Sequence, residues 1–205
     1  MVMNVSLLFQ QYGNSLVYAL GTALLATLVA VPTSYAMARW DSVWMKMLFW
    51  CCVVLLFLPF QVTMLPEYVL LEFLHLLDTR LAILIPGMVS PLPILILWMG
   101  NKQVPGEFED AFCLESGSLL SYFRFVLLPN LSGVIAAAFA ICFLLNWNLV
   151  DPALIFLEDK GLWPLSLTLL EQEGTARLYY GILDMVPVVL LLGVVMVVMR
   201  KRSMK

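Results

Sequence analysis

Residues 125–150 read FVLLPNLSGVIAAAFAICFLLNWNLV, a run without an acidic, basic or histidine side chain. An α-helix rises about 1.5 Å per residue, so about 20 apolar residues cross a hydrocarbon layer about 30 Å thick. Small residues within the run, among them Gly133 and Ala137, allow close packing against a neighbouring helix. The run is therefore predicted to be a membrane-spanning helix inside a bundle.

The same shortage of charge extends over the whole chain. Its 205 residues are 62% hydrophobic and 12% charged, whereas a soluble domain carries about a quarter charged residues. The stretches 1–38, 47–66 and 81–101 also contain no charged residue. We predict one all-α, polytopic transmembrane helical bundle over residues 1–205, with five spans. Their expected bounds are 14–40, from 44 to a stop or kink between Pro59 and Pro66, 81–100, from 128 or 129 to the polar residues at 146–151, and 179 or 182 to 199.

Several classes of function are excluded by what the sequence lacks. The net charge is −3 and the basic residues form no nucleic-acid face. The four cysteines contain no CxxC, and the single His75 cannot complete a Cys/His zinc set, so no metal site is expected. No GxxxxGK[ST] occurs to hold a nucleotide phosphate, and no cofactor is expected. One enzymatic alternative remains, an intramembrane acid/base group of Glu72, His75 and Asp78 at helical spacing.

The basic residues orient the spans. With the carboxyl terminus in the cytoplasm, eight Lys and Arg fall on the cytoplasmic side and three outside, as the positive-inside rule requires. The amino terminus is then expected outside. The cytoplasmic residues are Arg39, Lys46, Lys102, Arg124, Arg200, Lys201, Arg202 and Lys205, and the outer ones are Arg80, Lys160 and Arg177.

The longest cytoplasmic connection reads NKQVPGEFEDAFCLESGSLLSYFR at 101–124. Pro105 opens a predicted helix with carboxylates in its first turn, where the helix dipole favours them. Ser116-Gly117-Ser118 ends it, and a second helix continues to Pro129. The pattern predicts two short amphipathic helices joined by a tight turn. From amphipathicity alone, an interfacial linker lying on lipid headgroups fits equally well.

This connection resembles the EAA motif of ABC importer permeases. In that family a Glu-Ala-Ala triplet is followed three residues later by a glycine and then by Leu-Pro. The spacing matches, but Asp replaces Glu, Phe replaces the second Ala, and Ser replaces the Gly. The aligned positions are Asp110-Ala111-Phe112, Glu115-Ser116, Gly117, Phe123 and Pro129.

Three other patches resemble the carbohydrate-importer branch, the MalG-like permeases, in the family's order. They are NSLVYAL to SYAMAR at 14–39, LPFQVTMLPEYVLLEFLHLLDTRLAILIPG at 58–87 and NWNLVDPALIFLED at 146–159. The resemblance implies the type I importer permease fold. Members of the family generally have six spans, and the one without a counterpart among the five predicted here is the first.

The resemblance also implies a function. The chain would be the transmembrane subunit of an ATP-driven importer in the bacterial plasma membrane, forming half of the path for a carbohydrate and catalysing no reaction itself. Its partners would be a second permease subunit in a heterodimer, two ATP-binding subunits, an extracellular solute-binding protein and membrane lipid. Glycerol phosphate is an alternative solute, and an ATP-independent secondary transporter is a third reading.

Within this picture the loop 101–128 carries the coupling helix that contacts the ATPase. Its apolar side chains would pack into a groove, its carboxylates would meet basic groups, and the Ser-Gly-Ser turn would let the backbones approach closely. The expected coupling residues are Phe108, Asp110, Ala111, Phe112, Glu115, Ser116 and Gly117.

Polar side chains in apolar spans are the candidates for the substrate path, because they are costly in lipid unless they face a partner or a cavity. Amides suit sugar hydroxyls, and an aromatic face suits a pyranose ring. The residues are Gln61, Asn146, Trp147, Asn148 and Asp151. The alternative is that these residues form an aromatic belt and a helix end at the membrane interface. The chain would then contribute only to the wall of the translocation path and would not bind the solute.

Overall fold

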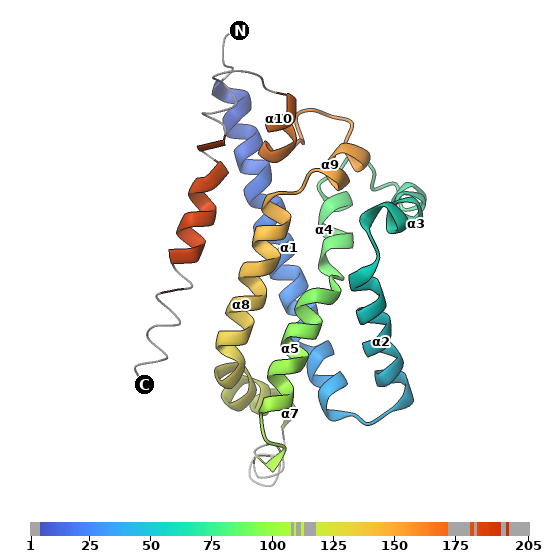
Figure 1. Cartoon of the computed structure of the whole chain (residues 1–205), viewed down its shortest axis with the longest axis vertical. Helices are drawn as coiled ribbons and strands as arrows, with labels where there is room; N and C mark the ends of the chain where they lie inside the picture. Colours follow the sequence, from blue (N-terminus) through green and yellow to red (C-terminus); the bar gives the residue numbers. More distant parts are fainter. Residues whose placement is uncertain are drawn as a thin grey trace.

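The computed structural model describes residues 5–107, 109, 112, 118–171, 181–182, 184–193 and 196, and their regular structure is helical throughout (Figure 1). The chain order is α1 (Val5–Arg39), α2 (Val43–Phe57), α3 (Phe60–Phe73), α4 (Leu81–Met88), α5 (Pro91–Gln103), α7 (Leu119–Tyr122), the π-helix η1 (Phe123–Leu127), α8 (Leu128–Trp147), α9 (Asp151–Phe156) and α10 (Leu165–Glu171). The predicted all-α bundle is confirmed.

Helix α1 is the central element, and α4, α5 and α8 pack along it (Figure 1). Two glycines permit the α1–α4 approach. A Cβ on Gly21 would lie 2.7 Å from a methyl carbon of Leu84, and one on Gly87 would lie 2.6 Å from the methyl carbon of Thr22. The side chains of Ala19, Ala23 and Ala26 on α1 are buried with Phe143 and Trp147 of α8. Small residues therefore set the distance between the helices, as expected for packing in lipid.

The start of α1 differs from the prediction. The first span is predicted from about Asn14, but the described helix already includes Val5. Gln11, Asn14 and Ser15 are buried in the structure. Their polar groups therefore belong to a helix that meets protein on this face, and polarity alone does not mark the helix end.

The second span bends where the prolines predict a break. Helices α2 and α3 meet at 110° across Leu58 and Pro59. With 15 residues, α2 rises about 22 Å, which is short of a full crossing. Pro66 lies inside α3 without ending it. The expected kink between Pro59 and Pro66 is confirmed at its first proline.

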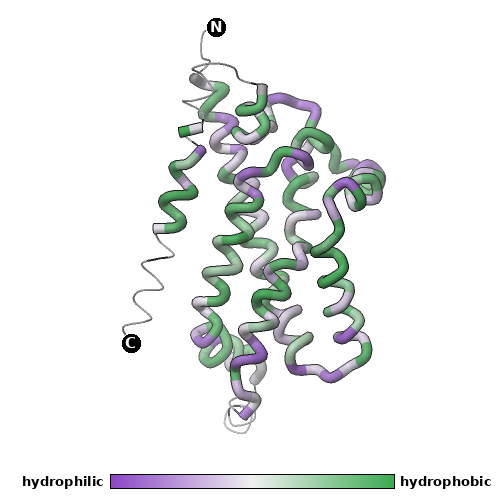
Figure 2. The backbone as a smooth tube through the Cα atoms, viewed as in Figure 1, coloured by the Kyte–Doolittle hydropathy of each residue, from purple (hydrophilic) through white to green (hydrophobic). Residues whose placement is uncertain are grey.

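The number of spans is smaller than predicted among the described residues. Three helical segments are long and apolar enough to cross a membrane, Ser6–Arg39, Leu81–Gln103 and Leu120–Trp147, and the bent α2–α3 pair makes up to four. Their apolar residues run between two more hydrophilic ends of the bundle (Figure 2). The predicted fifth span contains the short apolar helix Asp184–Gly193. The rest of that span lies outside the described residues, so five spans stay a prediction.

Candidate functional site

The loop 101–128 lies at the end of the bundle opposite the amino terminus (Figure 1). Of the expected coupling residues, Phe112 is described, and its ring lies 6.0 Å from that of Tyr122, centroid to centroid. The other six lie outside the described residues: Phe108, Asp110, Ala111, Glu115, Ser116 and Gly117. The candidate site therefore consists of the described residues that hold this loop in place.

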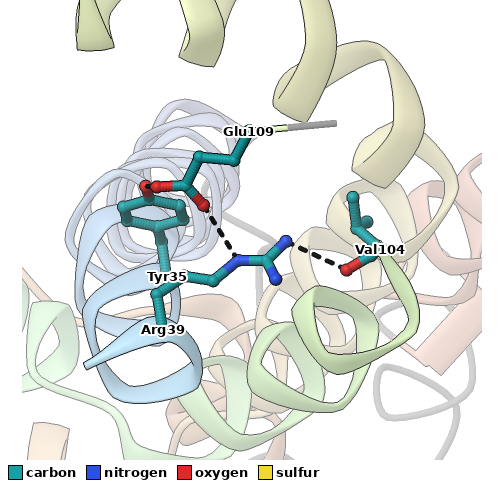
Figure 3. A network of polar contacts seen from close by, with 4 residues as sticks. All are labelled: Tyr35, Arg39, Val104 and Glu109. Atoms are coloured by element: carbon teal, nitrogen blue, oxygen red, sulfur yellow. Dashed lines mark hydrogen bonds and ion pairs between the residues drawn. The ribbon is translucent and has the colours of Figure 1, made fainter. Parts of the chain in front are cut away.

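A polar network fastens the loop to the end of α1 (Figure 3). Arg39, the last residue of α1, places Nε 3.2 Å from Oε2 of Glu109 and donates from Nη2 to the carbonyl oxygen of Val104 at 2.9 Å. Tyr35, one turn earlier, donates its hydroxyl hydrogen to Oε1 of the same carboxylate. The Arg39 and Glu109 side chains are 17% and 22% exposed, so water screens the pair less than an exposed one. A displacement of the loop would therefore pull directly on α1.

An aromatic cluster lies beside the network and joins the loop to α8. The Tyr35 ring meets Phe123 edge to face at 4.7 Å and lies 6.2 Å from Tyr122, which is fully buried. Phe123 begins η1, which continues into α8. Nearby, Asn101 at the end of α5 donates its amide hydrogen to Oγ of Ser34 at 3.0 Å. The loop is thus seated on α1, α5 and α8 together.

Sequence reasoning did not identify this network. In the sequence, Glu109 is a carboxylate in the first turn of a predicted helix, and Arg39 is the charge at the end of the first span. The two residues are 70 positions apart, so no local sequence pattern connects them. A signal exists in hindsight, because an arginine at a span end beside an acidic loop has a nearby ion-pair partner available.

The predicted substrate-path residues occupy two kinds of environment. Asn146 is partly buried in the last turn of α8, donates its amide hydrogen to the Cys142 carbonyl at 2.8 Å, and directs Oδ1 toward Gly87 of α4. Gln61, Asn148 and Asp151 are exposed. Asn146 is therefore the member of the set whose amide lies between the packed helices.

Trp147 has a packing role in this structure. Its side chain is fully buried, stacks on Phe143 at 5.7 Å, and meets the edge of Tyr12 at 5.6 Å. Its indole N–H donates to the Asp184 carbonyl at 2.9 Å. The ring is covered by protein in this structure, and a pyranose contact at Trp147 stays a prediction.

At the opposite end of the bundle, the loop between α9 and α10 forms a cap on α1. Asn14, 1% exposed, donates its amide hydrogens to the carbonyls of Gly161 at 2.7 Å and Trp163 at 3.3 Å, and accepts from Nη2 of Arg80 at 3.1 Å. Tyr18 donates to the Leu162 carbonyl at 2.8 Å. This cap, residues 157–165 on the first turns of α1, was not predicted, and it is named the outer cap after the orientation that the basic residues predict.

The enzymatic alternative does not survive the geometry. Helix α3 ends at Phe73, and His75 and Asp78 have φ values of 54° and 56°, so Glu72, His75 and Asp78 do not share a helical face. Oδ1 of Asp78 accepts the backbone N–H groups of Glu158 at 3.0 Å and Asp159 at 2.8 Å. Within the part of the chain that the structure describes, no three His, Cys, Asp or Glu residues are grouped to hold a metal.

Comparisons with known proteins agree with the fold. No protein-family model matches the chain. It is 27% identical over 170 residues to a lactose transport system permease protein of Rhizobium radiobacter, covering 83% of this chain and 62% of that protein. It is 28% identical over 155 residues to the sn-glycerol-3-phosphate transport system permease protein of Agrobacterium fabrum, covering 76% and 51%. The chain thus spans about half to two thirds of these relatives' lengths.

A solved structure shares the fold. A bacterial ABC transporter involved in the import of the acidic polysaccharide alginate superposes with a TM-score of 0.74 at 18% identity, covering 97% of this chain and 74% of that one. In sequence the chain is similar to permease proteins of ABC transport systems, and its apolar helices and its fold are those of a multi-pass membrane protein.

Proposed function

We propose that the chain is the transmembrane subunit of an ATP-driven importer, that it forms half of the translocation path for a carbohydrate, and that it couples to a cytoplasmic ATPase. The observation that carries the proposal is the seating of the loop 101–128, where Arg39 and Glu109 fasten the coupling segment to the central helix. A non-catalytic subunit needs such a link, because energy released elsewhere must reach its spans.

The distribution of charge supports the orientation. Arg39, Lys46, Lys102 and Arg124 lie in or beside the end that carries the loop, whereas Arg80 belongs to the end with the outer cap. The positive-inside rule then directs the loop to the cytoplasm and the amino terminus to the outside of a bacterial plasma membrane. The outer cap would face an extracellular solute-binding protein, and a second permease subunit would complete the path.

The solute we propose is a carbohydrate, since the lactose system permease aligns with 83% of the chain. Asn146 is the residue proposed to reach it, because its amide lies between α8 and α4. The similarity to a glycerol-phosphate permease favours glycerol phosphate as the second candidate. Uptake of a labelled disaccharide and of labelled glycerol phosphate by the assembled importer decides between them.

The coupling role is tested at Gly117, where we propose that the backbone approaches the ATPase. Gly117→Leu is expected to abolish solute-stimulated ATP hydrolysis and uptake in proteoliposomes while the complex still assembles in the membrane, because a side chain blocks close approach. Gly13→Leu is the control, since a Cβ there meets nothing within 4 Å. If Gly117→Leu transports like the unchanged protein, the coupling assignment is wrong.

A further inference from the structure

A pocket of about 330 Å³ opens at the end of the bundle that carries the loop 101–128. The end of α1, the connection to α2, the first turns of α2, and Trp98 and Lys102 of α5 form its wall. Three basic side chains and one carboxylate line it: Arg39, Lys46, Lys102 and Asp41. Among the described residues, Phe112 and the proposed substrate-path residues are not part of this wall.

Two of the three cations already have partners. Arg39 is paired with Glu109 at 3.2 Å, and Nζ of Lys46 lies 2.6 Å from Oδ1 of Asp41. Lys102 makes no ion pair with any carboxylate in the described part of the chain, and its ammonium lies 5.9 Å from the centroid of the Trp98 ring. The pocket therefore holds one positive charge in surplus.

The charges of the pocket act on one another. The pKa of Asp41 is lowered, first by the hydrogen bond and charge of Lys46 and then, more weakly, by the charge of Lys102. Asp41 thus stays ionised at neutral pH. Because Lys46 balances it, Lys102 is the cation that an incoming anion would neutralise.

An apolar stripe leads away from the pocket along α2. Trp50, in the pocket wall, is followed by Val54 and Phe57 at i+4 and i+7, on one face of the helix, and each is more than half exposed. Trp40, also in the wall, is 59% exposed. Exposed tryptophans beside basic residues are typical of the headgroup level of a membrane.

We propose that this pocket binds the headgroup phosphodiester of an anionic phospholipid, with an acyl chain lying along the stripe Trp50–Val54–Phe57. A phosphodiester carries one negative charge, which matches the single surplus cation. Free phosphate carries more than one negative charge at neutral pH and has no chain to cover the stripe. Basic pockets between membrane helices on the cytoplasmic side are suited to such headgroups.

The test uses the full chain in nanodiscs of phosphatidylcholine with added phosphatidylglycerol, and native mass spectrometry to count the phosphatidylglycerol retained. Lys102→Gln is expected to lower the preference for phosphatidylglycerol about fivefold, and Lys102→Arg to keep it. Arg124→Gln is the matched control, because Arg124 is exposed at the same end and lies 5.6 Å from the Phe125 ring but outside the pocket. It is expected to keep the preference within about twofold.

Asp41→Asn is a variant with the opposite expected effect on lipid preference. It removes the one carboxylate among the described residues of the pocket wall and is expected to raise the preference for phosphatidylglycerol, so the proposal is also tested by a gain. An unchanged preference in Lys102→Gln, or an equal loss in Arg124→Gln, would overturn the proposal. Displacement of the retained lipid by excess inorganic phosphate would overturn the lipid as the source of the anion.

Discussion

The two ends of the bundle are held in different ways. The outer cap is fixed mainly by neutral donors of α1 that bond to backbone carbonyls, as Asn14 does to Gly161 and Tyr18 to Leu162. The inner loop is fixed by a charged pair, Arg39 and Glu109, and by rings around Tyr35. The Gly161 carbonyl accepts from both Asn14 and Gln10, whereas the ion pair of the loop is a single, partly exposed contact that can open to water. We therefore expect the end with the outer cap to be the more rigid one and the end with the loop to be the one that transmits movement.

The largest expected effect on stability is at the outer cap. Asn14→Ala leaves the Gly161 and Trp163 carbonyls and the Arg80 guanidinium without this partner, and should lower the free energy of unfolding by about 2–3 kcal/mol. Unfolding by a denaturing detergent in mixed micelles measures it. Asn130→Ala is the control, since its exposed amide bonds to Val126 of the preceding turn. If the two variants lose the same unfolding free energy, the bonds of Asn14 to the cap do not stabilise this end specifically.

The inner loop should respond in function more than in stability. Given the proposed importer, Glu109→Gln is expected to lower solute-stimulated ATP hydrolysis about fivefold, because the loop then pulls less firmly on Arg39 and Tyr35. The assay compares hydrolysis with and without the solute and its binding protein. Glu107→Gln changes an exposed carboxylate two positions earlier in the same loop and should leave the stimulation intact. If Glu109→Gln keeps as much stimulation of ATP hydrolysis as Glu107→Gln, the proposed link from the loop to α1 is contradicted.

The smallest of the three effects is the loss of one hydroxyl. Tyr18→Phe removes the donor to the Leu162 carbonyl and should cost about 1 kcal/mol of unfolding free energy. Tyr12→Phe removes a hydroxyl that makes no hydrogen bond within the described residues and keeps the ring contact with Trp147. The same detergent titration measures both. If Tyr12→Phe costs more than Tyr18→Phe, hydrogen bonding to the cap is not what stabilises this end.

Sequence patterns predicted the features that depend on local chemistry. The bend at Pro59 follows from a missing backbone donor, and the end of α8 at Trp147 follows from the polar residues after it. The start of α1 was missed because burial of Asn14 depends on a loop about 150 residues away in sequence. The identity of the loop anchor was missed for the same reason, since Arg39 and Glu109 meet only in three dimensions.

Trp147 illustrates the same limit for the candidate site. Its residue type and its place beside Asn146 are compatible both with a sugar contact and with an aromatic belt at the membrane interface, and the sequence does not show how the ring packs. Here Phe143 and Tyr12 cover its ring. Asn146, by contrast, keeps the environment that the pattern suggested, between α8 and Gly87.

The π-helix η1 determines how far the loop is rotated around the helix axis relative to α8. A π-turn holds one residue more than an α-turn, and one residue corresponds to about 100° of rotation around a helix axis. Residues 123–127 therefore rotate Tyr122 and the loop before it around the helix axis, relative to Leu131 and Trp147 in the helix that follows. Removing a single residue from this turn would restore an α-helical ladder and rotate the loop away from Tyr35, with every side chain of α8 still in place.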